Sequence, residues 1–213
     1  MTNVKTKRLL LAFCILTAVF LAIGISVYYS SSPWGFARTV SDGESALRMS
    51  FVKEAEQYLG YNEIDGSHEI IVDIYNSHFP LAQGYAVAYE DSWCATFVSA
   101  TAIQCKLTDI IPTECGCERQ IGLFQELGCW KEADNYLPLP GDIIYYAWDE
   151  GFQFGDCTGW ADHVGIVIGT AGPIIKVIEG NKEDQVAYRY IPVNHWQIRG
   201  YAIPDYASNA HSK

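Results

Sequence analysis

Residues 91–99 read DSWCATFVS and place a thiol, Cys94, at the start of a predicted helix. Ser92 or Asp91 can cap this helix, because short polar side chains accept hydrogen bonds from the free N–H groups of a first helical turn. Apolar side chains at helical spacing predict a buried face, made by Trp93, Phe97, Ala100 and Ile103. At a helix start, unpaired N–H groups and the positive end of the helix dipole favour thiolate over thiol. The stretch therefore predicts a reactive cysteine on a helix that packs in the core.

A histidine and two further polar residues follow on predicted strands. From His163 the sequence alternates like a half-buried strand, and Gly165 allows a close backbone approach at the helix–sheet contact. A later apolar run ends in Glu179, and Asn181 follows two positions on. Residues of equal parity on a strand share a face, so both are expected beside the strand that carries His163, and either could hold its ring. Cys94, His163, Glu179 and Asn181 together supply a candidate nucleophile, base and orienter.

A simpler interpretation exists for each residue taken singly. A cysteine near a helix start is often a small buried hydrophobic residue, and a histidine on a strand often satisfies a hydrogen bond in the core. The combination of Cys94 and His163, in this order and spacing, is more specific than either residue alone.

The order of these segments, with PGDII at residues 140–144 opening a strand between them, resembles the CHAP family of cysteine, histidine-dependent amidohydrolases and peptidases. The resemblance covers roughly residues 45–205 and implies a papain-like α+β fold. It also implies cleavage of peptidoglycan amide bonds, either as an endopeptidase on stem peptides or cross-bridges or as an amidase between sugar and peptide. Residue by residue, Cys94 matches the nucleophile, His163 the base, and Glu179 and Asn181 the two polar positions that follow.

Some CHAP members carry an acidic calcium loop near the nucleophile, but this chain has no Asp-x-Asp-x-Asp-Gly run. No cofactor or metal is therefore expected. The loop 149–162 contains acidic residues that could bind a hard cation, but their spacing favours a solvated turn: Asp149, Glu150, Asp156 and Asp162. Because the loop leads directly into His163, we expect it at the rim of the cleft. Trp160 in this loop could pack on a sugar or peptide, or could support the loop itself.

The N-terminus predicts a membrane anchor. Lys5, Lys7 and Arg8 precede residues 9–29, which carry no charge and as a helix would span about 31 Å. The basic flank predicts a cytoplasmic N-terminus and an extracytoplasmic remainder. The resemblance to the CHAP family implies a bacterial membrane protein. A cleaved signal peptide is the alternative, although its apolar region is normally only about 7–15 residues long. The predicted organisation is thus an anchor at 1–29, a linker at 30–44, the catalytic domain at 45–205 and a tail at 206–213.

The negative net charge of the chain limits the kinds of molecule that it is expected to bind. The chain of 213 residues has a net charge of −11, and residues 1–29 contain basic but no acidic side chains, so the predicted exported part is more acidic still. This argues against nucleic acid and against adhesion to anionic lipids or wall polymers, although acidity can also serve solubility alone. The expected partners are peptidoglycan peptides and, through the anchor, the membrane; the oligomeric state is left open.

The periodicity predicts helices followed by a sheet. Helices are expected over 44–59, 67–79 and 117–127 besides the Cys94 helix. About five antiparallel strands are expected over 142–148, 163–170, 174–179, 185–193 and 198–203. The aromatic stretch 84–89 could line a substrate groove or pack in the core.

The remaining cysteines of the exported part are odd in number: Cys105, Cys115, Cys117, Cys129 and Cys157. The pair Cys115 and Cys117 is a weak zinc signal, and one or two disulfides or free thiols are the better interpretation. Two rival functions remain at this stage. One is a catalytically inactive CHAP-like wall-binding or scaffolding module, and the other is an acyltransferase that uses the same thioester.

Overall fold

The computed structural model describes residues 40–133, 135–148 and 159–210. The chain divides into two units, Met1–Arg38 and Thr39–Lys213, and all described residues belong to the second. The predicted anchor at 1–29 lies outside the described residues. Within the described part of the chain, no helix is both long and apolar enough to cross a membrane.

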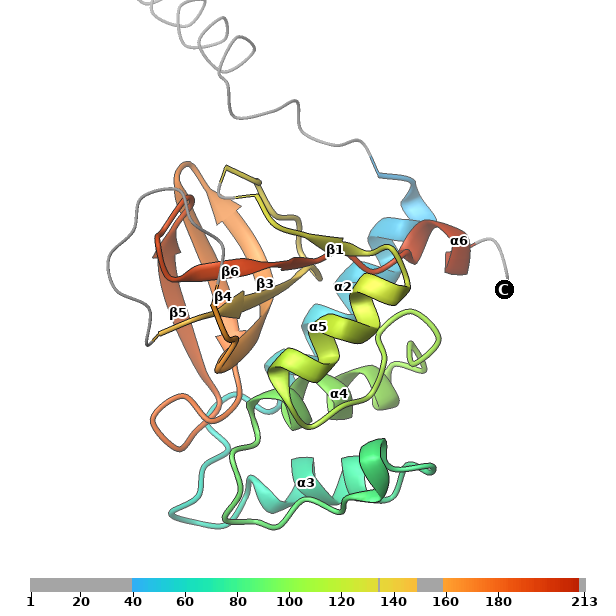
Figure 1. Cartoon of the computed structure of the whole chain (residues 1–213), viewed down its shortest axis with the longest axis vertical. Helices are drawn as coiled ribbons and strands as arrows, with labels where there is room; N and C mark the ends of the chain where they lie inside the picture. The colour runs from blue at the N-terminus through green and yellow to red at the C-terminus, as the bar shows by residue number, and fades with distance from the viewer. Residues whose placement is uncertain (1–39, 134, 149–158, 211–213) are drawn as a thin grey trace, which may run out of the picture. The chain divides into compact units, whose positions relative to one another are not determined.

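Five α-helices lie together on one side of a sheet (Figure 1). They are α2 (Asp42–Gln57), α3 (Glu69–Asn76), α4 (Cys94–Gln104), α5 (Cys117–Glu126) and α6 (Tyr206–Ala210), with a short 3-10 turn, η1 (Ala82–Gly84). Helix α4 is central, since it contacts α2, α3 and α5 as well as the sheet. Its side chains from Cys94 to Ala102 are all buried, so the helix is enclosed on every side and does not have a single buried face.

The sheet has six antiparallel strands in the order β1-β6-β2-β3-β4-β5. The strands are β1 (Trp130–Lys131), β2 (Ile143–Tyr146), β3 (His163–Ala171), β4 (Ile174–Glu179), β5 (Ala187–Pro192) and β6 (Ile198–Ala202). The predicted α+β class with an antiparallel sheet is confirmed. The two-residue strand β1 is additional to the five expected strands.

Both faces of the sheet are covered. In β2, Ile143 and Tyr145 belong to the core shared with the helices, whereas Ile144 and Tyr146 belong to a second core on the opposite face. Because side chains alternate along a strand, a strand between two cores must be apolar throughout, and all four residues of β2 are buried.

The packed domain extends beyond 45–205 at both ends. Helix α2 begins at Asp42, inside the predicted linker, and the hydroxyl oxygen of Ser41 caps it by accepting a hydrogen bond from the Glu44 backbone N–H at 3.1 Å. The predicted tail begins with α6, which contacts α2. Its buried Tyr206 donates a hydrogen bond of 2.8 Å to the Gly141 carbonyl.

A buried ion cluster joins α2 to the start of β2. Arg48 donates from Nε to Glu44 Oε1 and from Nη1 to Asp142 Oδ1, each at 2.8 Å. Asp142 also accepts hydrogen bonds from the Tyr136 hydroxyl and the Leu139 backbone N–H. Asp142, the acidic residue of the PGD motif, therefore holds the helix layer to the sheet.

Candidate active site

Cys94 is the first residue of α4, as predicted, but the predicted cap is wrong. Trp93 occupies the N-cap position, and no side chain caps the helix. The Asp91 carboxylate instead accepts hydrogen bonds of 2.7 Å from the Tyr85 hydroxyl and the Ala88 backbone N–H. The first turn of α4 thus has no side-chain cap, and its Ala95 N–H interacts with the Cys94 sulfur.

His163 is the first residue of β3, so its ring lies at the end of the strand. The ring is buried, is stacked on Tyr146, and places Nε2 3.1 Å from Glu179 Oε2. With Nε2 engaged in this way, Nδ1 is the ring nitrogen left for the Cys94 thiol. Cys94 and His163 interact, and each shifts the pKa of the other.

Glu179, the last residue of β4, is fully buried and has a second partner that the sequence analysis missed. Arg189 of β5 donates from Nε to both carboxylate oxygens of Glu179, at 2.6 and 2.9 Å. The guanidinium lies over the Trp148 ring, 4.6 Å from its centroid. The contact between Arg189 and Glu179 could have been predicted from the pairing register of β4 and β5. Arg189 pairs with Val177, which puts it diagonally across from Glu179 on the same face.

The predicted position of Asn181 is wrong. Strand β4 ends at Glu179, and Asn181 adopts a left-handed backbone conformation with φ 54°, so the parity argument does not extend to it. Among the described residues, no hydrogen bond joins Asn181 to His163 or Glu179. The structure thus brings together Cys94, His163 and Glu179 and leaves Asn181 in the turn that follows.

Two glycines make this arrangement sterically feasible. A Cβ atom on Gly165 would lie 2.7 Å from Glu179 Cγ, so its absence makes room for that side chain beside β3 and not, as predicted, for a helix. The close approach of helix and sheet occurs at Gly180. A Cβ atom there would collide with Phe97 and lie 2.9 Å from the Trp93 ring.

Of the two neighbouring thiols, Cys94 and Cys117, Cys94 is the one that is deprotonated. Its Sγ lies 3.6 Å from the Sγ of Cys117, the first residue of α5. A hydrogen bond from Cys117 lowers the pKa of Cys94 well below its ordinary value; burial opposes this, and His163 and the Ala95 N–H add to it. The pKa of Cys117 is correspondingly raised, first by its hydrogen bond to Cys94, then by burial and by the charges of Cys94 and Asp162. The two thiols therefore have opposite roles, acceptor and donor.

The histidine is held in its charged form. Burial lowers the pKa of His163, but hydrogen bonds and charges from Cys94 and Glu179 outweigh burial and raise it to about 9. For Glu179, burial acts to raise the pKa, yet hydrogen bonds from His163 and Arg189 lower it overall. The site is thus a thiolate–imidazolium pair with a buried, ionised carboxylate behind the imidazolium.

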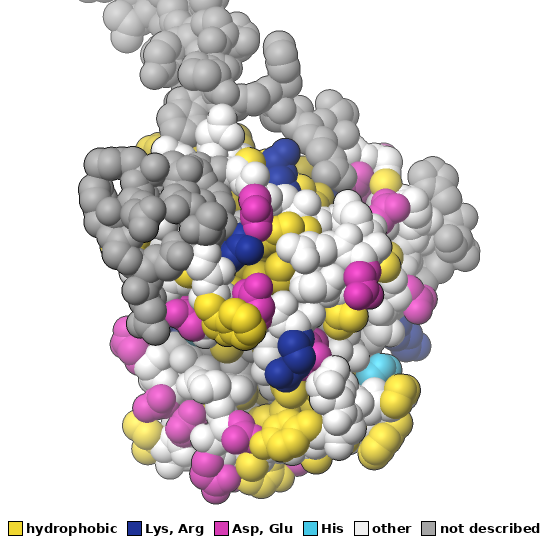
Figure 2. Space-filling view, viewed as in Figure 1, with side chains coloured by type: hydrophobic (Ala, Val, Ile, Leu, Met, Phe, Trp, Pro, Cys, Tyr) yellow, Lys and Arg dark blue, Asp and Glu magenta, His cyan; other side chains and the backbone are white. Residues whose placement is uncertain are grey.

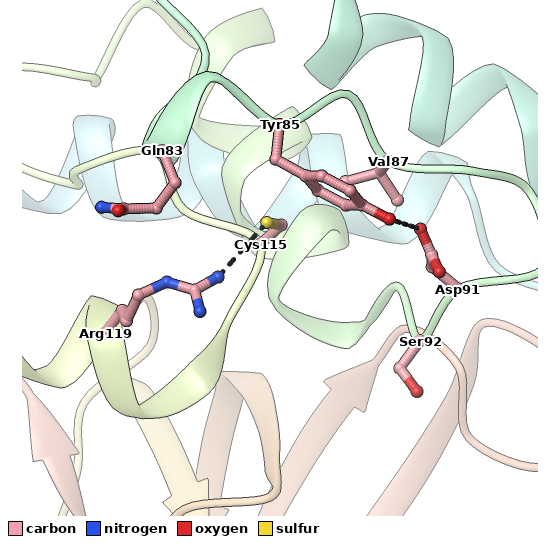
Figure 3. A pocket seen from close by; sticks show the side chains of 7 residues that line it. All are labelled: Gln83, Tyr85, Val87, Asp91, Ser92, Cys115 and Arg119. Atoms are coloured by element: carbon pink, nitrogen blue, oxygen red, sulfur yellow. Dashed lines mark hydrogen bonds between the residues drawn. The ribbon is translucent and has the colours of Figure 1, made fainter.

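The thiol opens onto a groove made of two adjoining hollows. One of about 190 Å³ is lined by Cys94, Cys117 and, from the predicted rim loop, Trp160 to Asp162. The other, of about 540 Å³, is lined by Tyr85, Val87 and Asp91 among others, so the stretch 84–89 contributes to the groove (Figure 3). The hollows share Ser92, Cys115 and Arg119.

Acidic side chains outnumber basic ones on the face shown in Figure 2. Of the described residues that line the groove, Arg119 alone is basic.

The other cysteines carry no disulfide within the described residues. Cys94, Cys105, Cys115, Cys117 and Cys129 are free thiols, and Cys157 lies outside the described residues. No group of three or more His, Cys, Asp or Glu side chains among residues 40–133, 135–148 and 159–210 is arranged to hold a metal ion. Asp149, Glu150 and Asp156 of the acidic loop lie outside those ranges.

Comparison of the chain with models of known protein families, with curated proteins and with solved structures finds no match.

Proposed function

We propose that this protein is a membrane-anchored, extracytoplasmic cysteine amidohydrolase of the CHAP type, with a papain-like fold, that cleaves amide bonds in peptidoglycan. The observation that carries the proposal is the arrangement around Cys94. A thiol at a helix start lies beside an imidazole whose other nitrogen is held by the fully buried carboxylate of Glu179. Burying such an ionised group is costly unless it is paired, and this pairing positions a base next to a nucleophile.

The reaction begins with attack of the Cys94 thiolate on an amide carbonyl carbon. The carbonyl oxygen takes up negative charge, which the free N–H groups at the start of α4 stabilise. The His163 imidazolium then gives its proton to the departing amine, and a thioester remains. A water molecule, deprotonated by the now neutral imidazole, attacks the thioester and releases the acid and the thiolate.

Peptidoglycan is the proposed substrate because of the resemblance of the motifs around Cys94, His163 and Glu179 to the CHAP family. The groove is compatible with a peptide chain, since its two hollows adjoin at Ser92, Cys115 and Arg119 and offer more room together than either does alone. The exposed indole of Trp160, 75% accessible, offers an apolar surface at the edge of this groove. Whether the enzyme is an endopeptidase or an N-acetylmuramoyl-L-alanine amidase depends on which bond reaches Cys94.

The decisive experiment uses the purified full-length chain in mild detergent with isolated sacculi. We expect mass spectrometry to detect new muropeptide fragments with the wild type and none with Cys94→Ala, whose folding circular dichroism verifies. The fragment masses identify the bond that is cut, and a product joined to an added amine would instead indicate acyl transfer. Wild-type turnover by Cys94→Ala would refute the nucleophile assignment, and intact sacculi with both proteins would favour a wall-binding module.

The membrane location rests on residues 1–29 and has its own test. We expect the full-length protein in the membrane fraction, and we expect protease added to intact protoplasts to remove the domain that follows residue 29. A shortened protein recovered from the medium would establish a cleaved signal peptide.

A further inference from the structure

Cys94 has a second thiol beside it that the proposed hydrolysis does not use. Cys117 Sγ lies 3.6 Å from Cys94 Sγ, close to contact. The two residues occupy equivalent positions, since each is the first residue of a helix, α4 for Cys94 and α5 for Cys117. Both are largely buried, yet both line the 190 Å³ hollow, so a small solute in the groove can reach them.

The position of Cys117 is fixed by a buried polar network. Ser99 of α4 donates to the Glu114 carbonyl at 2.7 Å and accepts from the Glu114 N–H at 2.9 Å. Gln120 of α5 donates to the Pro112 carbonyl and accepts from the Tyr145 hydroxyl. These bonds hold the start of α5 against α4 and the sheet, so the two thiols face each other in a fixed geometry.

The neighbouring Cys115 is a natural comparison. It lies two residues away and also lines the groove. Its sulfur accepts a hydrogen bond from Arg119 (Figure 3) and contacts Glu114. The sulfur of Cys117 instead contacts Cys94. Of the two thiols in this short motif, Cys117 is the one placed to react with Cys94.

We propose that Cys94 and Cys117 form a redox modification site, in which hydrogen peroxide oxidises Cys94 and Cys117 resolves it to a disulfide. The Cys94 thiolate attacks one peroxide oxygen, the O–O bond breaks, and hydroxide leaves as Cys94 becomes a sulfenic acid. The Cys117 sulfur then attacks the Cys94 sulfur, the S–O bond breaks, and an S–S bond forms. The hydroxyl leaves as water with the Cys117 proton. The hydroxide released in the first step takes up the proton held on His163, so two thiols lose two electrons and one peroxide becomes two waters.

The consequence is protection of the nucleophile. Oxidation of a sulfenic acid to a sulfinic acid is irreversible in most proteins, whereas a disulfide is reduced by thiols. A resolving thiol held in contact captures the sulfenic acid before a second peroxide arrives. The modification itself is independent of the hydrolase reaction; its effect on turnover rests on the function proposed above.

The test treats full-length protein in mild detergent with hydrogen peroxide, alkylates the remaining thiols and digests with trypsin. The expected product joins peptides 54–106 and 107–119, about 2 Da lighter than their sum, and fragmentation places the link at Cys94 and Cys117. Sacculus cleavage is expected to be lost with the link and regained with dithiothreitol. Cys115→Ser is the matched control and should form the same link.

In Cys117→Ser and Cys117→Ala we expect no link, and we expect Cys94 to accumulate as sulfinic acid with an activity loss that dithiothreitol does not reverse. A link from Cys94 to Cys115, or full recovery of Cys117→Ser after peroxide, would overturn the proposal. Formation of the Cys94–Cys117 link in a protein that never cleaves sacculi would uphold the redox site and refute the hydrolase. Cleavage of sacculi by a protein that does not form the link would uphold the hydrolase and refute the redox site.

Discussion

The molecule contains two buried ion clusters built from similar side chains and used differently. In the first, Arg48 of α2 is shared by two carboxylates, Glu44 and Asp142. In the second, one carboxylate, Glu179, is shared by two cationic groups, His163 and Arg189. No member of either cluster lines the two hollows of the groove, but the first cluster joins the helix layer to the sheet, whereas His163 of the second interacts with Cys94, which lines the smaller hollow. The second lies behind Cys94.

The difference lies in which member can exchange a proton. The Arg48 cluster consists of a guanidinium and two carboxylates and contains no imidazole. The Glu179 cluster includes an imidazole, whose proton can be transferred to a substrate. A buried ion cluster becomes a candidate catalytic site when one member exchanges protons and contacts a nucleophile that opens onto a groove, as His163 does with Cys94. Substitutions in the two clusters should therefore affect different properties.

Asp142→Ala should have the largest effect, and it should be on stability. Removal of the carboxylate leaves Arg48 buried with one carboxylate partner, and breaking a buried pair in this way costs about 3–5 kcal/mol. Chemical denaturation should show the loss as a lower midpoint with an unchanged slope. The control is Glu183→Gln, which removes an exposed ion pair with Lys182 and should leave the midpoint unchanged. An Asp142→Ala midpoint equal to wild type would contradict the structural role.

Glu179→Gln should reduce kcat/KM on one muropeptide by about 10²-fold, because the neutral amide stabilises the imidazolium less and holds its ring by a weaker hydrogen bond than the carboxylate does. Asn181→Ala should stay near wild type, since Asn181 lies in the turn after β4. Circular dichroism checks the folding of both variants. A greater loss for Asn181→Ala would reverse the assignment and make this a Cys-His-Asn site.

The pH profile of kcat/KM should also respond to Glu179→Gln, by a shift of its alkaline limb along the pH axis. The thiolate–imidazolium pair exists above the lowered pKa of Cys94 and below the pKa of His163, about 9. A bell-shaped profile of kcat/KM is expected, with its alkaline limb near pH 9. Because Glu179 raises the pKa of His163, the alkaline limb of Glu179→Gln should move to lower pH. An unmoved limb would show that another group sets it.

The shifted pKa values of His163 and Glu179 also make the free energy of unfolding depend on pH. The pKa of His163 is raised from 6.5 to about 9 in the folded protein. Its contribution to the free energy of unfolding is fully present below pH 6.5 and is lost as the pH rises through 9. The lowered pKa of Glu179 contributes in the opposite sense, above its unfolded value, and is lost on acidification.

The sequence predicted those parts of the fold that have a clear period. The strands at 163–170 and 174–179 alternate over enough residues to be recognised, and β3 and β4 match them closely. Strand β1, with two residues, and α6, with five, are too short to show a period, so they were missed. Tyr206, in the predicted tail, is buried by contacts with residues distant in sequence, and periodicity does not report such contacts.

Within the site, the sequence predicted residues that lie at recognisable element ends. Cys94 and Glu179 are such residues, the first of α4 and the last of β4. The position of Asn181 was wrong because parity holds only within a strand, and the chain turns at Gly180. Arg189 and Cys117 were missed because their contacts arise from strand pairing and from helix packing, which bring together residues 10 and 23 positions apart.

Trp160 gives the groove a built-in fluorophore. Its indole is 75% exposed and lines the same hollow as Cys94, whereas Trp93 is fully buried and should emit at short wavelength whether or not the groove is filled. A ligand seated beside Cys94 would exclude water from the Trp160 ring and shift its emission to shorter wavelength. Occupation of the groove can therefore be followed in real time on the unlabelled chain, with Trp160→Phe, which keeps the other tryptophans, as the reference for their background emission.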